Sequence, residues 1–98
     1  MADLDPVIHQ PVRLRIMASL VALHETESAE FTFLRELLGV TDGNLGAHVR
    51  KLEEEGYLLV EKTFVQRKPR TYLALSDKGR KAFKGHVAAL ESILRGKP

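Results

Sequence analysis

The sequence predicts a mainly α-helical domain that carries a small β-hairpin, and three observations support this fold class. Two helices, expected over 33–38 and 41–55, are separated by the short glycine-containing turn Leu38-Gly39-Val40. Two short strands joined by a basic tip follow within 57–75, and a long amphipathic helix is expected over 76–95. The 98 residues form one domain with an N-terminal segment (1–10), a core (11–75) and a C-terminal helical part (76–98).

The first part of the core is expected to be helical apart from one very short strand. A helix is expected from Pro11 to about His24, because apolar residues recur there at helical spacing: Val12, Ile16, Leu20 and Leu23. The polar run 25–28 closes it, and 29–31 is expected to form a strand with a single bridge. Thr32 is the expected N-cap of the helix over 33–38, whose inward-facing side chains are Leu34, Leu37 and Leu38.

The helix over 41–55 is expected to have one buried and one exposed face. Leu45, Val49 and Leu52 repeat at the spacing that buries one side of a helix. Thr41 is its expected N-cap, and the negative charge of Asp42 suits the positive end of the helix dipole. The opposite face then carries small or hydrogen-bonding residues, of the kind that can enter a DNA major groove: Gly43, Asn44, Ala47, Arg50 and Lys51.

The hairpin follows Gly56, which ends this helix. Residues 57–65 have the alternating and β-branched character of a strand, and 70–75 is the expected partner strand. The tip is expected at 66–69, where Pro69 needs no hydrogen-bond donor.

The last helix carries more apolar surface than the preceding elements can cover. Ser76 is its expected N-cap, and an apolar stripe follows at helical spacing: Phe83, Val87, Leu90 and Leu94, with Ile93 beside them. Because the core is already closed by Leu75, this stripe is expected to be covered by a partner.

Charge is unevenly distributed along the chain although the net charge is only +2. Residues 1–40 contain three basic and six acidic side chains, whereas 62–70 contains four basic residues and no acid: Lys62, Arg67, Lys68 and Arg70. A charged hairpin tip can serve solubility alone. Because this cluster directly follows two helices joined by a tight turn, it is also placed to touch DNA phosphates.

Several classes of function are excluded or disfavoured by composition. The absence of cysteine excludes disulfides and thiolate metal sites, and the four histidines lack the spacing of metal ligands. No cofactor is expected, and without a phosphate loop, nucleophile motif or paired carboxylates an enzyme is the weakest class. The longest apolar run is too short to cross a bilayer, so no membrane partner and a cytoplasmic location are expected. The rings of residues 31, 33, 57, 64, 72 and 83 are expected in the core or at an interface.

The order of helix, turn, helix and hairpin is that of a winged helix-turn-helix. The stretches 31–48, 52–57 and 68–72, with the closing Leu75-Ser76-Asp77-Lys78-Gly79-Arg80, resemble the small winged-helix transcriptional regulators related to the MarR and ArsR families, in particular compact prokaryotic dimers. The resemblance covers nearly the whole chain. It implies that the helix over 41–55 enters the major groove, that the wing over 62–70 contacts the backbone or minor groove, and that terminal helices form the dimer.

The candidate DNA-binding residues are Thr41, Asn44, Ala47, His48, Arg50, Lys51, Lys62, Arg67, Lys68 and Arg70, and the candidate dimer interface consists of Phe83, Val87, Leu90, Ile93 and Leu94. Asn44 has the groups to pair with adenine, and Arg50 and Lys51 those to reach guanine or phosphate. Alternatively, Arg50 and Lys51 form ion pairs with Glu54 or Glu55 along the helix.

Two glycines inside the predicted helix over 41–55 call for an explanation. Gly43 and Gly46 each cost about 1 kcal/mol relative to alanine in a helix interior. Close approach of the helix to DNA is one explanation, and an irregular first turn or tight packing between helices is the other.

Two functions from different classes are consistent with these patterns. The first is a homodimeric, sequence-specific regulator that binds double-stranded DNA, with an unknown effector. The second is a winged helix used as a protein-interaction or assembly module. An acidic exposed helix face would favour the second, but the exposed face of 41–55 is small, polar and basic over most of its length.

Overall fold

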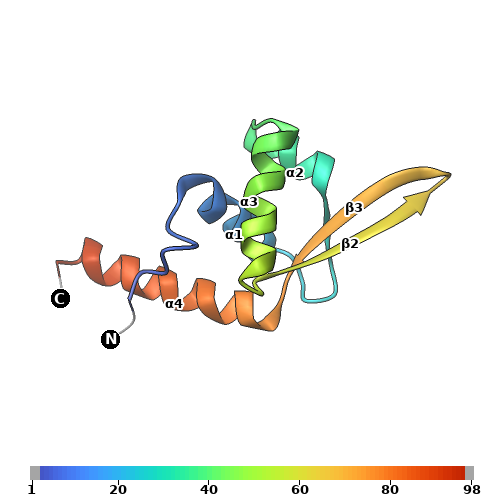
Figure 1. Ribbon diagram of the computed structural model, residues 1–98. Coiled ribbons are helices and arrows are strands. Elements are labelled where there is room, and N and C mark those ends of the chain that lie inside the picture. Colours follow the sequence, from blue (N-terminus) through green and yellow to red (C-terminus); the bar gives the residue numbers. More distant parts are fainter. Residues whose placement is uncertain (1–2, 97–98) are drawn as a thin grey trace.

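Residues 3–96, which the computed structural model describes, form helices and strands in the expected order (Figure 1). The elements are α1 (Pro11–Val21), β1 (Ala29–Glu30), α2 (Phe31–Leu38), α3 (Asp42–Glu54), β2 (Leu58–Val65), β3 (Lys68–Leu75) and α4 (Asp77–Leu94). The first two residues of the predicted N-terminal segment and the last two of the predicted C-terminal part lie outside the described residues. The described helices and their topology confirm the predicted winged helix-turn-helix.

The strands form a three-stranded antiparallel sheet in the order β1-β3-β2. The β2–β3 hairpin, the wing, turns at Gln66 and Arg67, both with positive φ (51° and 68°), as a tight two-residue hairpin turn requires. Pro69 therefore lies within β3, opposite Phe64, and not in the tip as the sequence predicted. The proline is tolerated because β1 pairs only with residues 72 and 73, so β3 has no second neighbour at Pro69.

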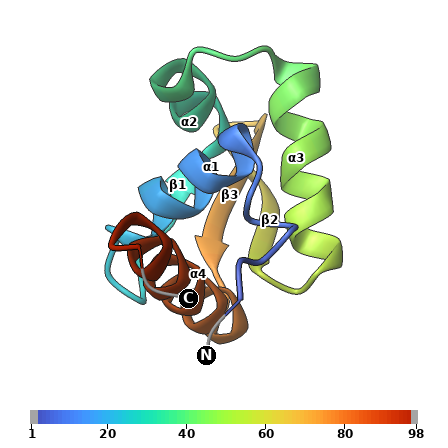
Figure 2. The ribbon, with the colours of Figure 1, turned by 90° about the vertical axis from the view of Figure 1, so that its left-hand side faces the viewer.

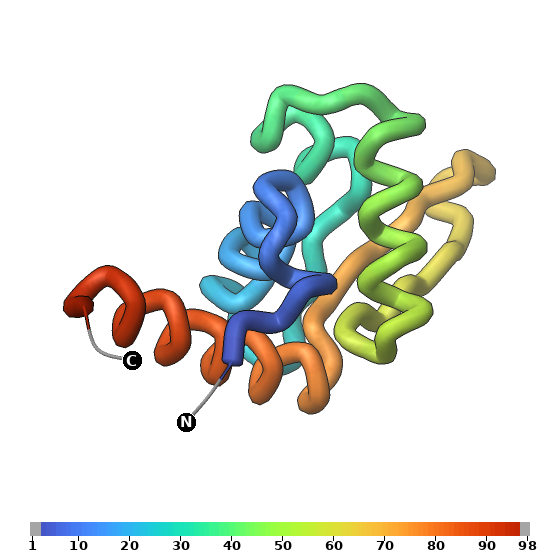
Figure 3. Tube along the Cα trace, turned by 60° about the vertical axis from the view of Figure 1, so that its left-hand side comes forward, coloured from blue at the N-terminus to red at the C-terminus, as the bar shows by residue number. Residues whose placement is uncertain are grey.

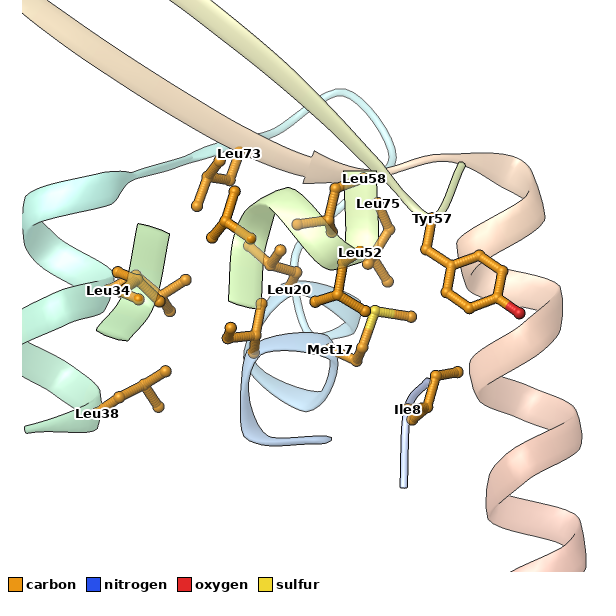
Figure 4. Packing of buried hydrophobic residues seen from close by; sticks show 13 residues of the cluster. Ile8, Met17, Leu20, Leu34, Leu38, Leu52, Tyr57, Leu58, Leu73 and Leu75 are labelled. Atoms are coloured by element: carbon orange, nitrogen blue, oxygen red, sulfur yellow. The ribbon is translucent and has the colours of Figure 1, made fainter. Parts of the chain in front are cut away.

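A single hydrophobic core lies between the three N-terminal helices and the base of the sheet (Figure 4). Its buried residues come from the N-terminal segment, from all three helices and from the strands: Ile8, Ile16, Met17, Leu20, Leu34, Leu38, Leu45, Val49, Leu52, Tyr57, Leu58, Leu73 and Leu75. The predicted buried face of α3 is thus confirmed.

Two details of α1 and α2 differ from the sequence prediction. α1 ends at Val21 and not near His24. α2 begins two residues early, at Phe31, and its N-cap is Glu30, which makes no capping bond, so Thr32 is not the cap. Residues 31, 34 and 38 face the core, whereas Leu37 is 56% exposed instead of packed inward.

Helix α4 begins as predicted, since the Ser76 hydroxyl accepts a hydrogen bond from the backbone N–H of Gly79. The part of the helix up to Ala89 packs on the domain: His86 and Ala89 are buried and Phe83 contacts the core. Its C-terminal end projects beyond the domain (Figure 3), where Ile93 and Leu94 are 55% and 81% exposed. The predicted stripe is therefore divided, because Phe83 is covered by the chain's own core. None of the helices described is long and apolar enough to cross a membrane.

Candidate nucleic-acid interface

The start of α3 is held in place by contacts that cross the turn from α2. Gly39 adopts a left-handed conformation (φ 67°), and its N–H donates to the carbonyl of Arg35. The Thr41 hydroxyl accepts from the backbone N–H of Asn44 at 3.1 Å, which confirms the predicted cap. Arg35 Nη1 lies 2.8 Å from Asp42 Oδ1, and hydrogen bonding and attraction to this carboxylate raise the pKa of Arg35.

The face of α3 opposite the core is open to solvent. Gly43, Asn44, Ala47, Arg50 and Lys51 are all exposed, along the full length of the helix. Within residues 3–96, neither Arg50 nor Lys51 makes an ion pair, so the alternative pairing along the helix is not formed. In Figure 2 this helix stands at one edge of the molecule, with its outer side uncovered.

His48 differs from the other candidates on α3 because it is half-buried and accepts a hydrogen bond from another helix. Arg13 Nη1, from α1, donates to His48 Nδ1 at 3.2 Å. Burial first, and then the positive charge of Arg13, lower the pKa of His48. The neutral ring therefore keeps its proton on Nε2, the only ring nitrogen left to contact DNA.

Nothing in the described part of the chain requires glycine at the two glycine positions of α3. A Cβ atom built at Gly43 or at Gly46 would meet no heavy atom within 4 Å. Neither glycine has a positive φ, and both lie inside regular helix. Tight helix packing and an irregular first turn therefore do not explain these glycines.

The register of the wing separates its basic residues onto different faces. Residues directly opposite in an antiparallel pair project to the same side. Lys62 and Thr71 thus belong to the side that continues from the buried Leu73, here called the front face. The back face carries the pairs Val65–Lys68 and Thr63–Arg70, while Arg67 lies in the turn.

Arg70 is the one wing cation in the described residues with an ionic partner. Its Nη1 atom lies 2.9 Å from Glu30 Oε1, at the end of β1. The predicted basic cluster is therefore not one patch: Arg70 is neutralised by Glu30, whereas Lys62, Arg67 and Lys68 are exposed and form no ion pair in the described residues.

The front face of the wing and α3 line a common groove. It is formed by Gly46, Arg50 and Glu53 of α3 and by Lys62 and Thr71 of the wing, over a floor of Phe31, Val49 and Val60. Two cations and one acid thus face the same open space. The helix and the front face of the wing therefore present one continuous surface to a ligand.

The N-terminal segment connects α4 to the base of α3. The backbone N–H of Asp5 donates to His86 Nδ1 at 2.9 Å, and the Tyr57 hydroxyl donates to the Asp5 carboxylate. His86 therefore carries its proton on Nε2, which donates to His9 Nδ1 at 3.3 Å. Arg13 Nε donates to the carbonyl of Val7 in the same segment.

The buried groups in this connection have shifted pKa values. Burial and the neighbouring His9 lower the pKa of His86, and the negative charge of Asp5 opposes this only in part. Burial would raise the pKa of Asp5, but hydrogen bonds from Tyr57 and from the backbone N–H groups of Val7 and Ile8 outweigh it and hold the pKa below its ordinary value. Neutral His86 and ionised Asp5 are thus the forms that the fold favours.

Sequence reasoning did not identify Asp5, Arg13, His86 or the exposed Phe64 as residues that shape this surface. Asp5 and His86 are 81 positions apart, and no local pattern indicates their contact. Phe64 could have been placed from strand alternation, because it follows Leu58, Val60 and Lys62 on one face. The rings of Phe33 and Phe64 are 61% and 73% exposed, so neither belongs to the core.

The described residues contain no group of three or more side chains suited to hold a metal ion.

Comparisons with known proteins identify the family and agree with the fold. Residues 12–94 match the family model of the winged helix DNA-binding domain. An uncharacterized protein of Methanocaldococcus jannaschii is 38% identical over 81 residues, which cover 83% of this chain and 85% of that protein. The structure of a transcriptional regulator homologue from Pyrococcus horikoshii OT3 is 32% identical with a TM-score of 0.83, over 92% of this chain and 86% of that one. A PadR family transcriptional regulator from Eggerthella lenta is 25% identical with a TM-score of 0.68, over 88% and 83% of the two chains.

Proposed function

Since the chain belongs to the winged helix DNA-binding domain family, we propose that it is a sequence-specific transcriptional regulator that binds double-stranded DNA as a homodimer. The family is one of DNA-binding regulators and not of enzymes. The observation that carries the proposal is the open, ion-pair-free face of α3, which is continuous with the front face of the wing. Two statements stay predictions: that the chain is related to the MarR and ArsR families in particular, and that it is cytoplasmic.

In this proposal α3 enters the major groove. Asn44 reads adenine, Ala47 leaves room for a base edge or a thymine methyl group, and Arg50 and Lys51 reach guanine or phosphate. Thr41 and His48 contact the backbone from the two flanks of the helix, His48 through its Nε2–H. Gly43 and Gly46 allow the helix backbone to come close to the DNA.

The wing supplies contacts that do not depend on sequence. Lys62, Arg67 and Lys68 are exposed and without acidic neighbours in 62–70, as phosphate-binding side chains require. Arg70 must break its ion pair with Glu30 before it can bind a phosphate, so its expected contribution to DNA affinity is smaller.

The dimer is proposed to form through the C-terminal part of α4, from Val87 to Leu94. Ile93 and Leu94 are exposed, and Val87 and Leu90 are half-buried on the same helix. Burying a leucine is worth about 1.5 to 3 kcal/mol, so two copies of this half-helix would gain from packing together. A two-fold dimer would present its recognition helices about 34 Å apart, or at a multiple of this distance, and would select a pseudo-palindromic site.

The test of DNA binding is fluorescence anisotropy with a 30-base-pair duplex of random sequence at several salt concentrations. We expect affinity to fall steeply with salt, because binding releases counterions from phosphates. Replacing Arg67 by alanine removes two contacts from a dimer, so the slope of log affinity against log salt should fall by about 2 units. Arg70→Ala should change the slope less. A wild-type chain without affinity for duplex DNA at low salt would contradict the proposal.

Sequence specificity is tested with a site selected from a random DNA pool by the wild-type protein. Asn44→Ala should cost about 1 to 3 kcal/mol on the selected site and much less on the random duplex. An equal loss on both duplexes would make Asn44 a backbone contact and not a base-reading residue.

The protein-interaction function is the second candidate because α2 carries an exposed apolar patch. Phe33 and Leu37, one turn apart on α2, are 61% and 56% exposed. An assembly module would keep this patch and lack affinity for DNA, so the same anisotropy experiment distinguishes the two functions.

A further inference from the structure

The outer part of the wing carries an exposed aromatic ring on its front face. Phe64 is 73% exposed and lies opposite Pro69 in the hairpin register. It lies four positions after Val60, which still packs against the core on the same face. At about 3.3 Å per residue, Phe64 lies roughly 13 Å beyond the core along the strand. The ring therefore does not pack against the core of the described residues.

The surroundings of this ring indicate an anionic partner. Lys62 precedes it on the front face, and Arg67 and Lys68 follow it around the turn. No acidic residue occurs in 62–70. The partner must therefore combine negative charge with apolar surface, and it must also reach the groove that the wing shares with α3.

The minor groove of double-stranded DNA meets these requirements. Its edges are lined by phosphates and its walls by deoxyribose, and proteins often place apolar side chains in it. The minor groove next to a recognition helix lies about half a helical turn away along the DNA, roughly 17 Å, which is comparable to the reach of the wing.

We infer that Phe64, with Pro69 beside it, enters the minor groove and positions the wing on the DNA. This inference rests on the proposed function, and it assigns to Phe64 the apolar contact between the wing and the DNA. Arg67 supplies phosphate contact at the turn, and Lys62 supplies it on the front face. Lys68, on the back face with Val65, contacts only the rim of the groove.

The test compares Phe64→Ala with the matched control Val65→Ala. Val65 is the neighbouring exposed residue, but it projects to the back face. On a random-sequence duplex we expect Phe64→Ala to weaken binding by about tenfold or more, because apolar burial is lost in both subunits. The salt slope should stay at the wild-type value, since no phosphate contact is removed. Val65→Ala should bind like the wild type, and all three proteins should melt at the same temperature.

A second duplex, with every guanine replaced by inosine, locates the ring. Inosine lacks the amino group that guanine projects into the minor groove, while its major-groove edge is unchanged. The wild type should bind this duplex more tightly than the guanine duplex, and Phe64→Ala should lose that preference. Comparing the two proteins removes any effect of duplex stiffness.

The outcomes separate this inference from the proposed function. If the wild type binds neither duplex, the proposed function fails, and the inference fails with it. If the wild type binds and Phe64→Ala binds equally well, or keeps the full preference for inosine, DNA binding stands and the inference is overturned.

Discussion

Adding a methyl group to either glycine of α3 should change stability and DNA affinity in opposite directions. Alanine is favoured over glycine in a helix interior by about 0.5 to 1 kcal/mol, and a Cβ atom at Gly46 or Gly43 meets nothing within 4 Å. Gly46→Ala should therefore stabilise the fold by about 1 kcal/mol. For a domain of this size such a gain raises the melting temperature by roughly 4 to 8 °C. Gly43, in the first turn, should give a smaller gain.

The same methyl group should obstruct a helix that approaches DNA closely. Overpacking a tight contact typically costs about 1 to 3 kcal/mol, so the affinity for duplex DNA should fall about fivefold or more. Circular dichroism melting measures the first effect, and fluorescence anisotropy with the random duplex and the selected site measures the second. Both are run on the same preparations.

Gly85→Ala provides a matched control on α4. Gly85 also has nothing within 4 Å of an added Cβ, but it lies outside the proposed DNA surface. The Gly85→Ala substitution should raise the melting temperature by a similar amount and leave DNA affinity unchanged. If Gly43→Ala and Gly46→Ala both stabilise the protein and bind DNA like the wild type, close approach is not the reason for these glycines.

Three further predictions concern α4 and its contacts. Gly79→Ala would place a Cβ 2.2 Å from the Tyr57 carbonyl oxygen. The free energy of unfolding, measured by urea denaturation, should therefore fall by about 1 to 3 kcal/mol or more. An unchanged free energy of unfolding would disprove the close packing of α4 on Tyr57. Because the folded state lowers the pKa of His86 from its ordinary value of 6.5, the unfolded state binds more protons, and the free energy of unfolding should fall as the pH drops below about 6.5. His86→Gln should weaken this pH dependence, leaving the part due to His48, and an unchanged dependence would contradict the assignment. Leu94→Asp should shift the protein toward monomer in sedimentation equilibrium at micromolar concentration, whereas Leu37→Asp should not, and a monomeric wild type would rule out the proposed dimer.

The features that sequence predicted correctly are those determined by neighbouring residues. Thr41 and Ser76 cap the helices expected of them, because a cap needs only a hydroxyl and an N–H three residues later. The buried face of α3 follows from the spacing of three apolar residues on one helix. The wing strands follow from β-branched residues and alternation, although the tight turn placed Pro69 inside β3.

The features that sequence missed depend on which parts of the chain meet in space. Leu37 was expected inside because it is apolar, but the core takes Leu34 and Leu38 from α2 and leaves Leu37 exposed. Arg70 was grouped with the other wing cations, yet Glu30, from a strand 40 positions earlier, neutralises it. Strand register, and not composition, separates Lys62 from Lys68 and Arg70 on the wing. The candidate residues were thus identified by type, while their availability to a ligand was decided by tertiary contacts.

The contacts of Asp5 bear directly on how a dimer could recognise DNA. Asp5 binds α4 through His86 and the loop after α3 through Tyr57. Arg13 binds both Val7 of the same segment and His48 on α3. Gly79 also brings the start of α4 against the backbone of Tyr57. The recognition helix is therefore held relative to α4 by buried contacts at several points. In a dimer built on α4, the separation of the two recognition helices, and hence the spacing of the half-sites, would be determined by these contacts and not by the recognition residues themselves.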